Sequence, residues 1–392
     1  MMSKAHICMV SDQPLANILP TLVPELKPDT VYLLTSEQQR QKGNGEAQKN
    51  VFSHLGITAE IIPIGSAFNL EEVQKVVQQL IDSHPQQQLL LNATGGTKPM
   101  SIAAYELCYS ADIRVFYLQS EQIIWLNPLQ DESMSLSQSL SLSDYLNAHD
   151  IEVTDYVTNK VPQARSELAG IWAKRARKHS QPYARLNYYA QQASNDRLTA
   201  TLDAKDNKGN GLSVILDELE RLQMLQQQAA QITFADEDAR FFANGGWLEE
   251  WLFSELMQLK QKYPTITSVA RSVSVELHNQ QTQQPVRNEL DVIAIVNNRL
   301  WVFECKTKRM QGKHQPRGEN EAQHMIYKLA GLMKSLGGLR TCGCVVSFNA
   351  LSDYDKARAE LFDIGTIDGR NLAELRSQLA QLLGLRAHAS HQ

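Results

Sequence analysis

The sequence has no long apolar segment and no paired cysteine motif. No apolar run approaches the roughly 20 residues that a helix needs to span a bilayer. The N-terminal stretch MMSKAHICMV also lacks the length and the flanking residues of a signal peptide. We therefore expect a cytoplasmic protein that has no membrane partner.

Cysteine and net charge each exclude a class of site. The five cysteines form no CxxC pair and have no histidine at zinc-site spacing, and four lie in apolar runs that read as buried elements. We therefore expect buried thiols rather than a zinc site. The net charge of −5 argues against a protein held in nucleic acid by bulk electrostatics, but it leaves room for a local basic groove.

The 392 residues suit two or three domains rather than one. Over residues 1–140, short β-branched runs alternate with segments of helical periodicity. This pattern predicts a doubly wound, mostly parallel α/β domain with an antiparallel hairpin at one edge. Residues 141–236 are helical and polar in pattern and predict a small linker domain, for which a winged helix is one candidate. Residues 237–392 return to mixed helices and strands, which predicts a third, α/β domain.

The stretch NATGGTKPMS at 92–101 follows a buried strand and opens a helix. Gly95 and Gly96 would let the backbone approach a ligand, and the following N–H groups and the helix dipole favour an anion. Further donors come from Asn92, Thr94, Thr97 and Lys98. The spacing is neither GxxxxGK[ST] nor GxGxxG, so we expect binding of a phosphorylated ligand without a hydrolysis apparatus. A glycine turn that only caps the helix is the alternative.

A second loop, VSDQP, follows the first strand and would lie at the same edge of the sheet. Read alone, it could equally be a turn that caps a helix. In this order the two loops resemble the CARF domain, the sensor module of CRISPR-associated proteins that bind cyclic oligoadenylates. The resemblance implies a Rossmann-like fold and a homodimer whose paired loops form one symmetric cleft. The residues that would line this cleft are Ser11, Gln13, Asn92, Thr94, Gly95, Gly96, Thr97 and Lys98.

The stretch ELDVIAIVNNRLWVFECK at 289–306 carries Glu289, Asp291, Glu304 and Lys306 in a run that is otherwise apolar enough for a sheet interior. If the two asparagines form a two-residue turn, counting outward pairs Ile295 with Leu300, Ile293 with Val302, Asp291 with Glu304 and Glu289 with Lys306. Opposed residues have Cβ atoms about 4.5 to 5.5 Å apart. Two carboxylates at that separation repel by about 3 kcal/mol at an effective dielectric constant of 20.

A divalent cation between Asp291 and Glu304 would reverse the sign of this interaction, and oxygen ligands suit Mg²⁺ or Mn²⁺. The backbone carbonyl of Cys305 is a candidate third ligand, and Lys306 could orient or acidify the attacking water. An exposed hairpin with ordinary salt bridges is the alternative. We favour it less because VIAIV and LWVF are apolar on both faces. A slipped register would separate the two carboxylates.

The spacing of Asp291, Glu304 and Lys306 resembles that of the PD-(D/E)xK nuclease superfamily, with Leu290 in place of the proline. In that restriction-endonuclease-like fold, the helix before the hairpin adds a glutamate, which GGWLEEWL supplies as Glu249 or Glu250. We favour Glu249, whose helical neighbours are apolar. The resemblance thus implies the catalytic set Glu249, Asp291, Glu304 and Lys306.

Two further features follow the hairpin. Gln323 and Tyr327 stand four residues apart on a predicted helix and resemble the QxxxY motif of some of these nucleases. The preceding loop, 308–317, is basic and could form a local phosphate-binding edge; as an alternative it is a basic loop with no partner.

The order of sensor, linker and nuclease resembles the CARF nucleases of type III CRISPR immunity in prokaryotes. The resemblance implies a homodimer that binds cyclic tetra-adenylate, or less often another ring size, and then cleaves DNA, RNA or both with Mn²⁺ or Mg²⁺. Two alternatives remain open: a nucleotide-responsive transcription regulator with a degenerate nuclease domain, and an unregulated restriction or repair nuclease.

Overall fold

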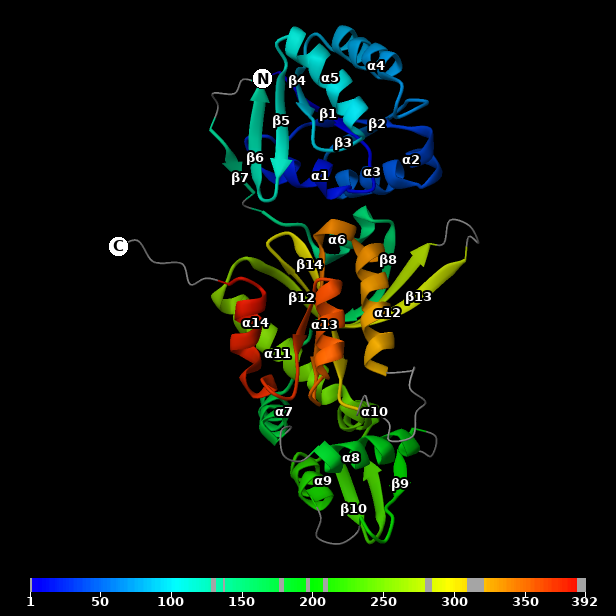
Figure 1. Ribbon diagram of the computed structural model, residues 1–392, viewed down its shortest axis with the longest axis vertical. Helices are drawn as coiled ribbons and strands as arrows, with labels where there is room; N and C mark the ends of the chain where they lie inside the picture. The colour runs from blue at the N-terminus through cyan, green and yellow to red at the C-terminus, as the bar shows by residue number, and fades with distance from the viewer. Residues whose placement is uncertain are drawn as a thin grey trace, which may run out of the picture. The chain divides into compact units, whose positions relative to one another are not determined.

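The computed structural model describes most of the chain. The described residues are 2–127, 132–136, 138–175, 180–194, 198–206, 211–278, 284–308 and 321–385. The chain forms two compact units (Figure 1). The first comprises Met1–Thr154, Val275–Asn288 and Ser335–Arg340, and the second comprises Asp155–Ser274, Glu289–Lys334 and Thr341–Gln392. No helix in the described part of the chain is long and apolar enough to cross a membrane.

The first unit is built on a seven-stranded sheet in the order β3-β2-β1-β4-β5-β6-β7. The strands are β1 (Lys4–Met9), β2 (Thr30–Thr35), β3 (Thr58–Pro63), β4 (Gln88–Asn92), β5 (Arg114–Gln119), β6 (Gln122–Asn127) and β7 (Met134–Ser135). The first five strands are parallel, and the pairs β5–β6 and β6–β7 are antiparallel. The doubly wound α/β fold and its antiparallel edge hairpin are therefore confirmed.

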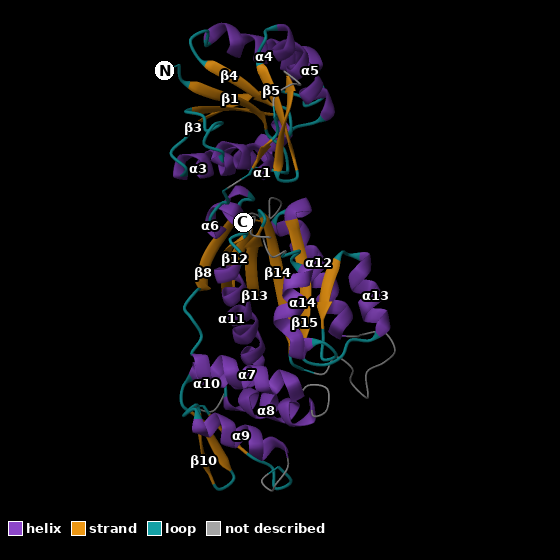
Figure 2. Ribbon diagram, turned by 90° about the vertical axis from the view of Figure 1, so that its left-hand side faces the viewer, coloured by secondary structure: helices purple, strands orange, loops and turns teal. Residues whose placement is uncertain are grey.

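Helices cover both faces of this sheet (Figure 2). They are α1 (Leu15–Ile18), η1 (Leu19–Leu22), α2 (Glu37–Gln41), α3 (Asn44–His54), α4 (Leu70–Ser83) and α5 (Lys98–Ser110), with α6 (Leu142–Ala148) following β7. The apolar stripe of α4 and the small residues of α5 pack with β1 and β4 in one core. Because β1 and β4 are apolar on both faces, they occupy the centre of the sheet, as buried parallel strands do.

Two buried histidines make the stability of the first unit depend on pH. Burial lowers the pKa of His6 to about 3 and that of His149 to about 4. Below about pH 6.5, the unfolded chain binds more protons at these sites than the folded unit does. We expect stability to be complete above about pH 6.5 and to fall as the pH drops from there toward 4. Urea unfolding at a series of pH values measures the slope, and His6→Phe should flatten it; an equal slope in the variant would contradict the assignment.

The segment after α6 contains more strand than its polar pattern predicted. Its elements are β8 (Ile151–Val157), α7 (Gln163–Arg175), α8 (Ser180–Ala193), β9 (Thr199–Thr201), α9 (Gly211–Arg221), β10 (Leu225–Gln228) and β11 (Gln231–Phe234). Strands β9, β10 and β11 form a small antiparallel sheet in the order β10-β11-β9. From α7 onward, the elements follow in the order helix, helix, strand, helix, strand, strand, so this segment is mixed rather than wholly helical.

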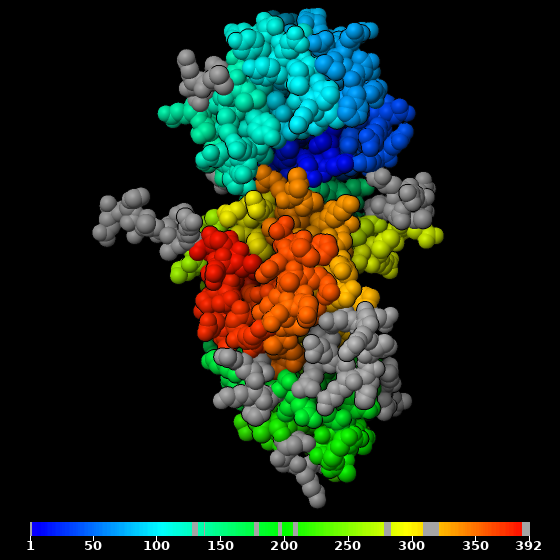
Figure 3. Space-filling model, viewed as in Figure 1, coloured from blue at the N-terminus to red at the C-terminus, as the bar shows by residue number. Residues whose placement is uncertain are grey.

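The second large sheet has six strands in the order β16-β15-β14-β13-β12-β8. Its remaining strands are β12 (Ile266–His278), β13 (Pro285–Val296), β14 (Arg299–Lys306), β15 (Thr341–Ser347) and β16 (Ile364–Ile367). The accompanying helices are α10 (Glu237–Phe241), η2 (Phe242–Gly246), α11 (Trp247–Lys262), α12 (Glu321–Leu336), η3 (Gly338–Arg340), α13 (Asp353–Leu361), η4 (Leu372–Glu374) and α14 (Leu375–Leu382). In the space-filling view, α13 and α14 form much of the surface beside this sheet (Figure 3).

One apolar core joins the elements from α7 to β11 to this sheet. The core contains Trp172 of α7, Tyr183 of α8 and Trp247 of α11, whose rings meet at centroid distances of 5.4 to 6.4 Å. It continues through α11 to one face of β13 and β14. Helix α12 packs on the other face. Its Met333 lies directly over Gly343 of β15, where an added Cβ would collide with it. Thus α11 and α12 lie on opposite faces of the hairpin β13–β14.

Candidate active site and sensor site

The hairpin has the register expected from the sequence over its first five pairs. These are Val296↔Arg299, Ile295↔Leu300, Ala294↔Trp301, Ile293↔Val302 and Val292↔Phe303. Asn297 and Asn298 form the turn with φ values of 50° and 53°, as a two-residue hairpin turn requires. The ladder ends at Val292, one residue before the predicted pair of carboxylates.

The ladder ends because a side chain replaces the backbone acceptor. Hydrogen-bonded pairs alternate along an antiparallel ladder, so the N–H of Cys305 would next meet Leu290. Instead, Cys305 N donates to Oδ2 of Asp291 at 2.6 Å. The Cys305 side chain points to the opposite face and is buried in the core. Beyond this point β13 and β14 are no longer paired, and we call the gap between them, which Asp291 occupies, the fork. The carbonyl of Cys305 lies on the same side of the strand as its N–H group, so it faces the fork.

Glu304 lies beside this fork with a buried carboxylate that contacts two lysines. Its side chain is 4% exposed, and its Oε1 lies 3.1 Å from Nζ of Lys306 and 3.6 Å from Nζ of Lys328. Lys306 was predicted, but Lys328 of α12 was not. A lysine on an amphipathic helix carries no signal by itself in a single sequence. The one sequence signal near Lys328 is the QxxxY-like pair, whose tyrosine, Tyr327, directly precedes it.

The electrostatics of the cluster oppose full ionisation of its acids. Burial and the charge of Glu304 raise the pKa of Asp291 to about 7. Burial and the charge of Asp291 likewise raise the pKa of Glu249 well above its ordinary value. Burial alone would lower the pKa of Lys306, but the charges of Glu304 and Asp291 outweigh it and raise that pKa. Full ionisation of the three acids is therefore unfavourable, and a bound cation would relieve their mutual repulsion.

The two candidate glutamates of α11 have different surroundings. Glu249 interacts electrostatically with Asp291, Glu304 and Lys306, so it belongs to the cluster. Glu250 is 3% exposed and pairs instead with Arg165 of α7. These positions agree with the choice of Glu249 as the candidate catalytic glutamate.

The donors at the fork suit a hard cation that keeps part of its water shell. In the part of the chain that the structure describes, no three His, Cys, Asp or Glu side chains form a ready-made metal cage. Asp291, Glu304 and the carbonyl of Cys305 supply oxygen donors, which Mg²⁺ and Mn²⁺ prefer, and Mg²⁺ ordinarily retains several waters. The residues present therefore fit such an ion. The basic loop 309–317 lies outside the described residues, apart from Lys308 before it.

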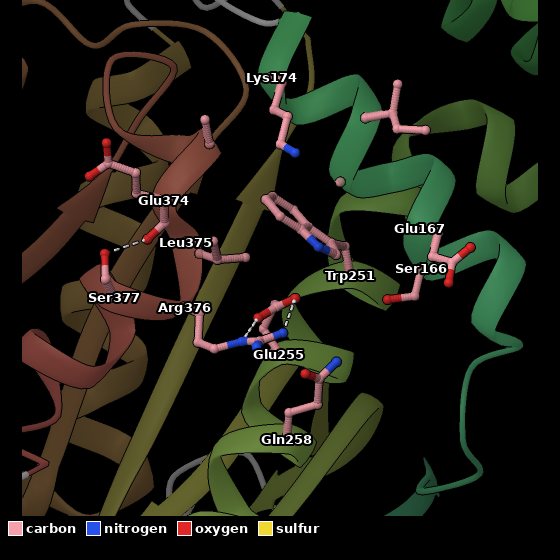
Figure 4. Close-up of a pocket in the computed structure, with 13 residues that line it drawn as sticks. Ser166, Glu167, Lys174, Trp251, Glu255, Gln258, Glu374, Leu375, Arg376 and Ser377 are labelled. Atoms are coloured by element: carbon pink, nitrogen blue, oxygen red, sulfur yellow. Dashed lines mark hydrogen bonds and ion pairs between the residues drawn. The ribbon is translucent and has the colours of Figure 1, made fainter. Parts of the chain in front are cut away.

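A cavity of about 740 Å³ lies away from this cluster, between α7, α11 and α14 (Figure 4). Trp251, Glu255 and Gln258 line it from α11, on the side of that helix turned away from Glu249. Glu255 forms an ion pair with Arg376 of α14, with Oε2 to Nε at 2.5 Å. The cavity is therefore separate from the candidate catalytic centre.

The predicted sensor loops follow β1 and β4, which are neighbours at the point where the strand order reverses. Open α/β sheets bind their ligands in this crevice. The loop after β4 packs against the end of β1: a Cβ on Gly95 would lie 2.5 Å from the carbonyl oxygen of Met9, and one on Gly96 would lie 2.7 Å from Met9 Cβ. Gly96 also has a φ of 79°, which an L side chain rarely adopts. Both glycines are thus required by packing against β1.

Three of the predicted side chains hold the loop together from within. Asn92 is fully buried; its Nδ2 donates to Ala16 O at 2.9 Å, and its Oδ1 accepts from Thr94 N and Thr94 Oγ1 at 3.1 and 2.6 Å. Thr97 caps α5 through Met100 N and donates to Ala67 O at 2.7 Å. The structure therefore places Asn92 beneath the loop rather than at its surface.

Four of the other predicted positions are more accessible, whereas Gly95 is buried. Ser11 and Gln13 are half-buried, with Gln13 N donating to Ser11 Oγ at 3.3 Å, and Lys98 is exposed at the start of α5. In the described residues, no protein acceptor contacts the N–H groups of Gly95 and Gly96. These two groups and Lys98 gather at a helix N-terminus, the arrangement that binds anions.

Family models match both ends of the chain. Residues 5–145 match the Card1 CARF domain, and residues 236–384 match the Card1-like endonuclease domain. The chain belongs to the Card1-like CARF nucleases. These matches confirm the predicted CARF sensor domain and the predicted nuclease domain.

Three solved structures resemble this chain over most of its length. Protein VC1899 from Vibrio cholerae has a TM-score of 0.88 at 25% identity, covering 97% of this chain and 98% of that chain. Can2 from Sulfobacillus thermosulfidooxidans, solved in complex with cyclic tetra-adenylate, has a TM-score of 0.78 at 23% identity, covering 97% and 99%. A type III CRISPR defence DNA nuclease activated by cyclic oligoadenylate has a TM-score of 0.53 at 15% identity, covering 88% and 45%. No curated protein matches the sequence.

Proposed function

We propose that this nuclease is switched on by cyclic tetra-adenylate bound at the sensor loops, and that it cleaves DNA, RNA or both with Mn²⁺ or Mg²⁺. The observation that carries the nuclease half is the fork at the end of β13–β14. There Asp291 leaves the ladder and lies beside Glu304, which two lysines contact. A stable hairpin has no need of a buried carboxylate beside a half-buried one at this position, whereas a cation site does.

Each residue of the cluster has a distinct role in this proposal. Asp291, Glu304 and the Cys305 carbonyl hold the ion, which when bound supplies an activated water and a Lewis acid. Lys306 stays protonated beside Glu304, so it can orient the attacking water and stabilise charge that develops on the phosphate. Glu249, whose raised pKa favours the protonated form, can hold a proton near the fork.

The sensor half rests on anion-binding groups around the N-terminus of α5. The N–H groups of Gly95 and Gly96, together with Ser11, Gln13 and Lys98, face a ligand at the switch point of the sheet, while Asn92, Thr94 and Thr97 fix the loop's shape. Can2, which shares this fold, was solved with cyclic tetra-adenylate. We therefore expect the same ring size as the activator here.

A homodimer is part of the proposal, and α5 offers the surface for it. Ile102 and Tyr109 are 61% and 59% exposed, and with Lys98 and Tyr105 they form one stripe at helical spacing. The second copy of this chain is the proposed occupant because the stripe continues from the sensor loop. Pairing α5 across a two-fold axis would bring both loops to one symmetric ligand. We also propose that this dimer acts in the cytoplasm of a prokaryote.

The test is cleavage of supercoiled plasmid, labelled single-stranded DNA and labelled RNA in Mn²⁺ or Mg²⁺, with and without cyclic tetra-adenylate. We expect cleavage only with activator and metal, and loss of cleavage in EDTA and in Glu304→Ala. Glu360→Ala, which alters an exposed glutamate of α13, is the matched control and should cleave normally. The molar mass of the same samples in solution reports the dimer.

Each other outcome identifies a different error. Cleavage without activator would make the protein an unregulated nuclease. Tight activator binding without cleavage on any substrate would favour a nucleotide-responsive regulator. Full cleavage in EDTA would remove the metal from the mechanism.

A further inference from the structure

We propose that Lys328 of α12 is a second catalytic cation, which contacts the phosphate of the scissile bond; this rests on the proposed nuclease function. Its Nζ lies 3.6 Å from the same Glu304 oxygen that Lys306 approaches at 3.1 Å. The Glu304 side chain is only 4% exposed, whereas those of Lys306 and Lys328 are 43% and 50% exposed. Both ammonium groups therefore stand between the buried carboxylate and solvent, where a substrate phosphate must arrive.

The charges of the site give Lys328 a function beyond pairing with Glu304. A phosphodiester is anionic and has to approach the acidic side chains of Glu249, Asp291 and Glu304. The ammonium of Lys328 is half exposed beside Glu304 and so is available to the incoming phosphate, in a partly dehydrated site where such contacts are strong.

The packing of α12 fixes which of its residues faces the fork. Leu329 and Met333 lie over Gly343 of β15, because a Cβ there would come within 3.2 and 2.5 Å of their side-chain atoms. Tyr327 is turned toward α13, where its ring meets Phe362 at 5.6 Å and lies 5.9 Å from the Arg358 guanidinium. The rotation of α12 therefore presents Lys328, rather than the tyrosine of the QxxxY-like pair, to Glu304.

Three variants test this role. Lys328→Ala removes the charge, Lys328→Arg keeps it, and Lys334→Ala alters an exposed lysine on the same helix as a matched control. At saturating activator, metal and substrate, we expect Lys328→Ala to slow cleavage by about 30- to 100-fold. We expect Lys328→Arg to recover part of this loss, because the guanidinium also binds phosphate. Lys334→Ala should cleave at the wild-type rate.

A binding measurement separates a phosphate contact from a structural effect. In the Asp291→Asn background with activator present, the affinity for a fluorescein-labelled oligothymidylate is measured over a range of salt concentrations. Losing one phosphate contact should reduce the slope of log K against log[salt] by about 0.7. A Lys328→Ala slope equal to that of Lys334→Ala would overturn the proposal, even if cleavage were slow. Absence of activator-dependent cleavage in the wild type would instead count against the proposed function, and the salt slope would still decide the contact.

Discussion

Replacing Asp291 with asparagine is expected to abolish cleavage without destabilising the protein. An amide oxygen can still accept the hydrogen bond from Cys305 N, which Asp291 Oδ2 now accepts at 2.6 Å. The substitution removes a carboxylate whose pKa burial and Glu304 raise to about 7, so it relieves repulsion in the fold. It also removes a charged ligand of the proposed cation. We expect a loss of at least about 10³-fold in single-turnover cleavage and a melting temperature equal to or above that of the wild type.

Asp353→Asn provides the control, because that aspartate is 95% exposed on α13 and lies away from the fork. It should change neither rate nor melting temperature. A rate for Asp291→Asn within about tenfold of the wild type would show that Asp291 does not hold an essential cation. A large drop in melting temperature would show that the carboxylate has a structural role in closing the fork.

Replacing Arg165 with methionine is expected to destabilise the second unit by about 3 to 5 kcal/mol. Arg165 of α7 pairs with Glu250, whose side chain is 3% exposed, and its guanidinium lies 4.9 Å from the Phe242 ring centre. Burial already raises the pKa of Glu250, and Arg165 is the foremost group that opposes this rise. Without Arg165, the buried carboxylate has lost its principal counter-charge. Urea unfolding at pH 7.5 measures the loss.

A double-mutant cycle distinguishes the ion pair from simple loss of packing. We expect Arg165→Met with Glu250→Gln to recover most of the stability lost by Arg165→Met alone, because no unpaired buried charge remains. If the two single changes were additive, the proposed coupling would be wrong. Cleavage by the double variant then reports whether this contact also positions the adjacent Glu249.

The hairpin shows how far a single sequence can predict a catalytic centre. The asparagine pair fixed the turn, and alternation along two apolar strands then fixed the register of the five observed pairs. The same count could not predict that the ladder would end at Val292, because the end depends on a side chain competing for the Cys305 N–H group. It also could not predict Lys328, which reaches Glu304 only through the packing of α12 on β15.

The sensor loop shows a different limit. Its motif located the crevice at the switch point of the sheet, because strand order and glycine content are visible in sequence. Which donors face outward is decided by packing: Asn92 and Thr97 turn inward to satisfy backbone groups, whereas Lys98 remains exposed. The short strands β9, β10 and β11 were missed because segments of three or four residues carry little β signal, and β10, LQQQ, is mostly glutamine.

Strand β8 has a consequence for how this chain could be divided during evolution. It forms one edge of the six-stranded sheet, although it precedes the elements from α7 to β11 in the chain. A gene fragment encoding only 236–384 would lack this strand and leave the backbone groups of β12 open to pairing with other chains. It would also lack α7 and α8, which complete the core around Trp247. The nuclease half is therefore not an exchangeable module, and recombination that moves it intact has to carry the chain from β8 onward.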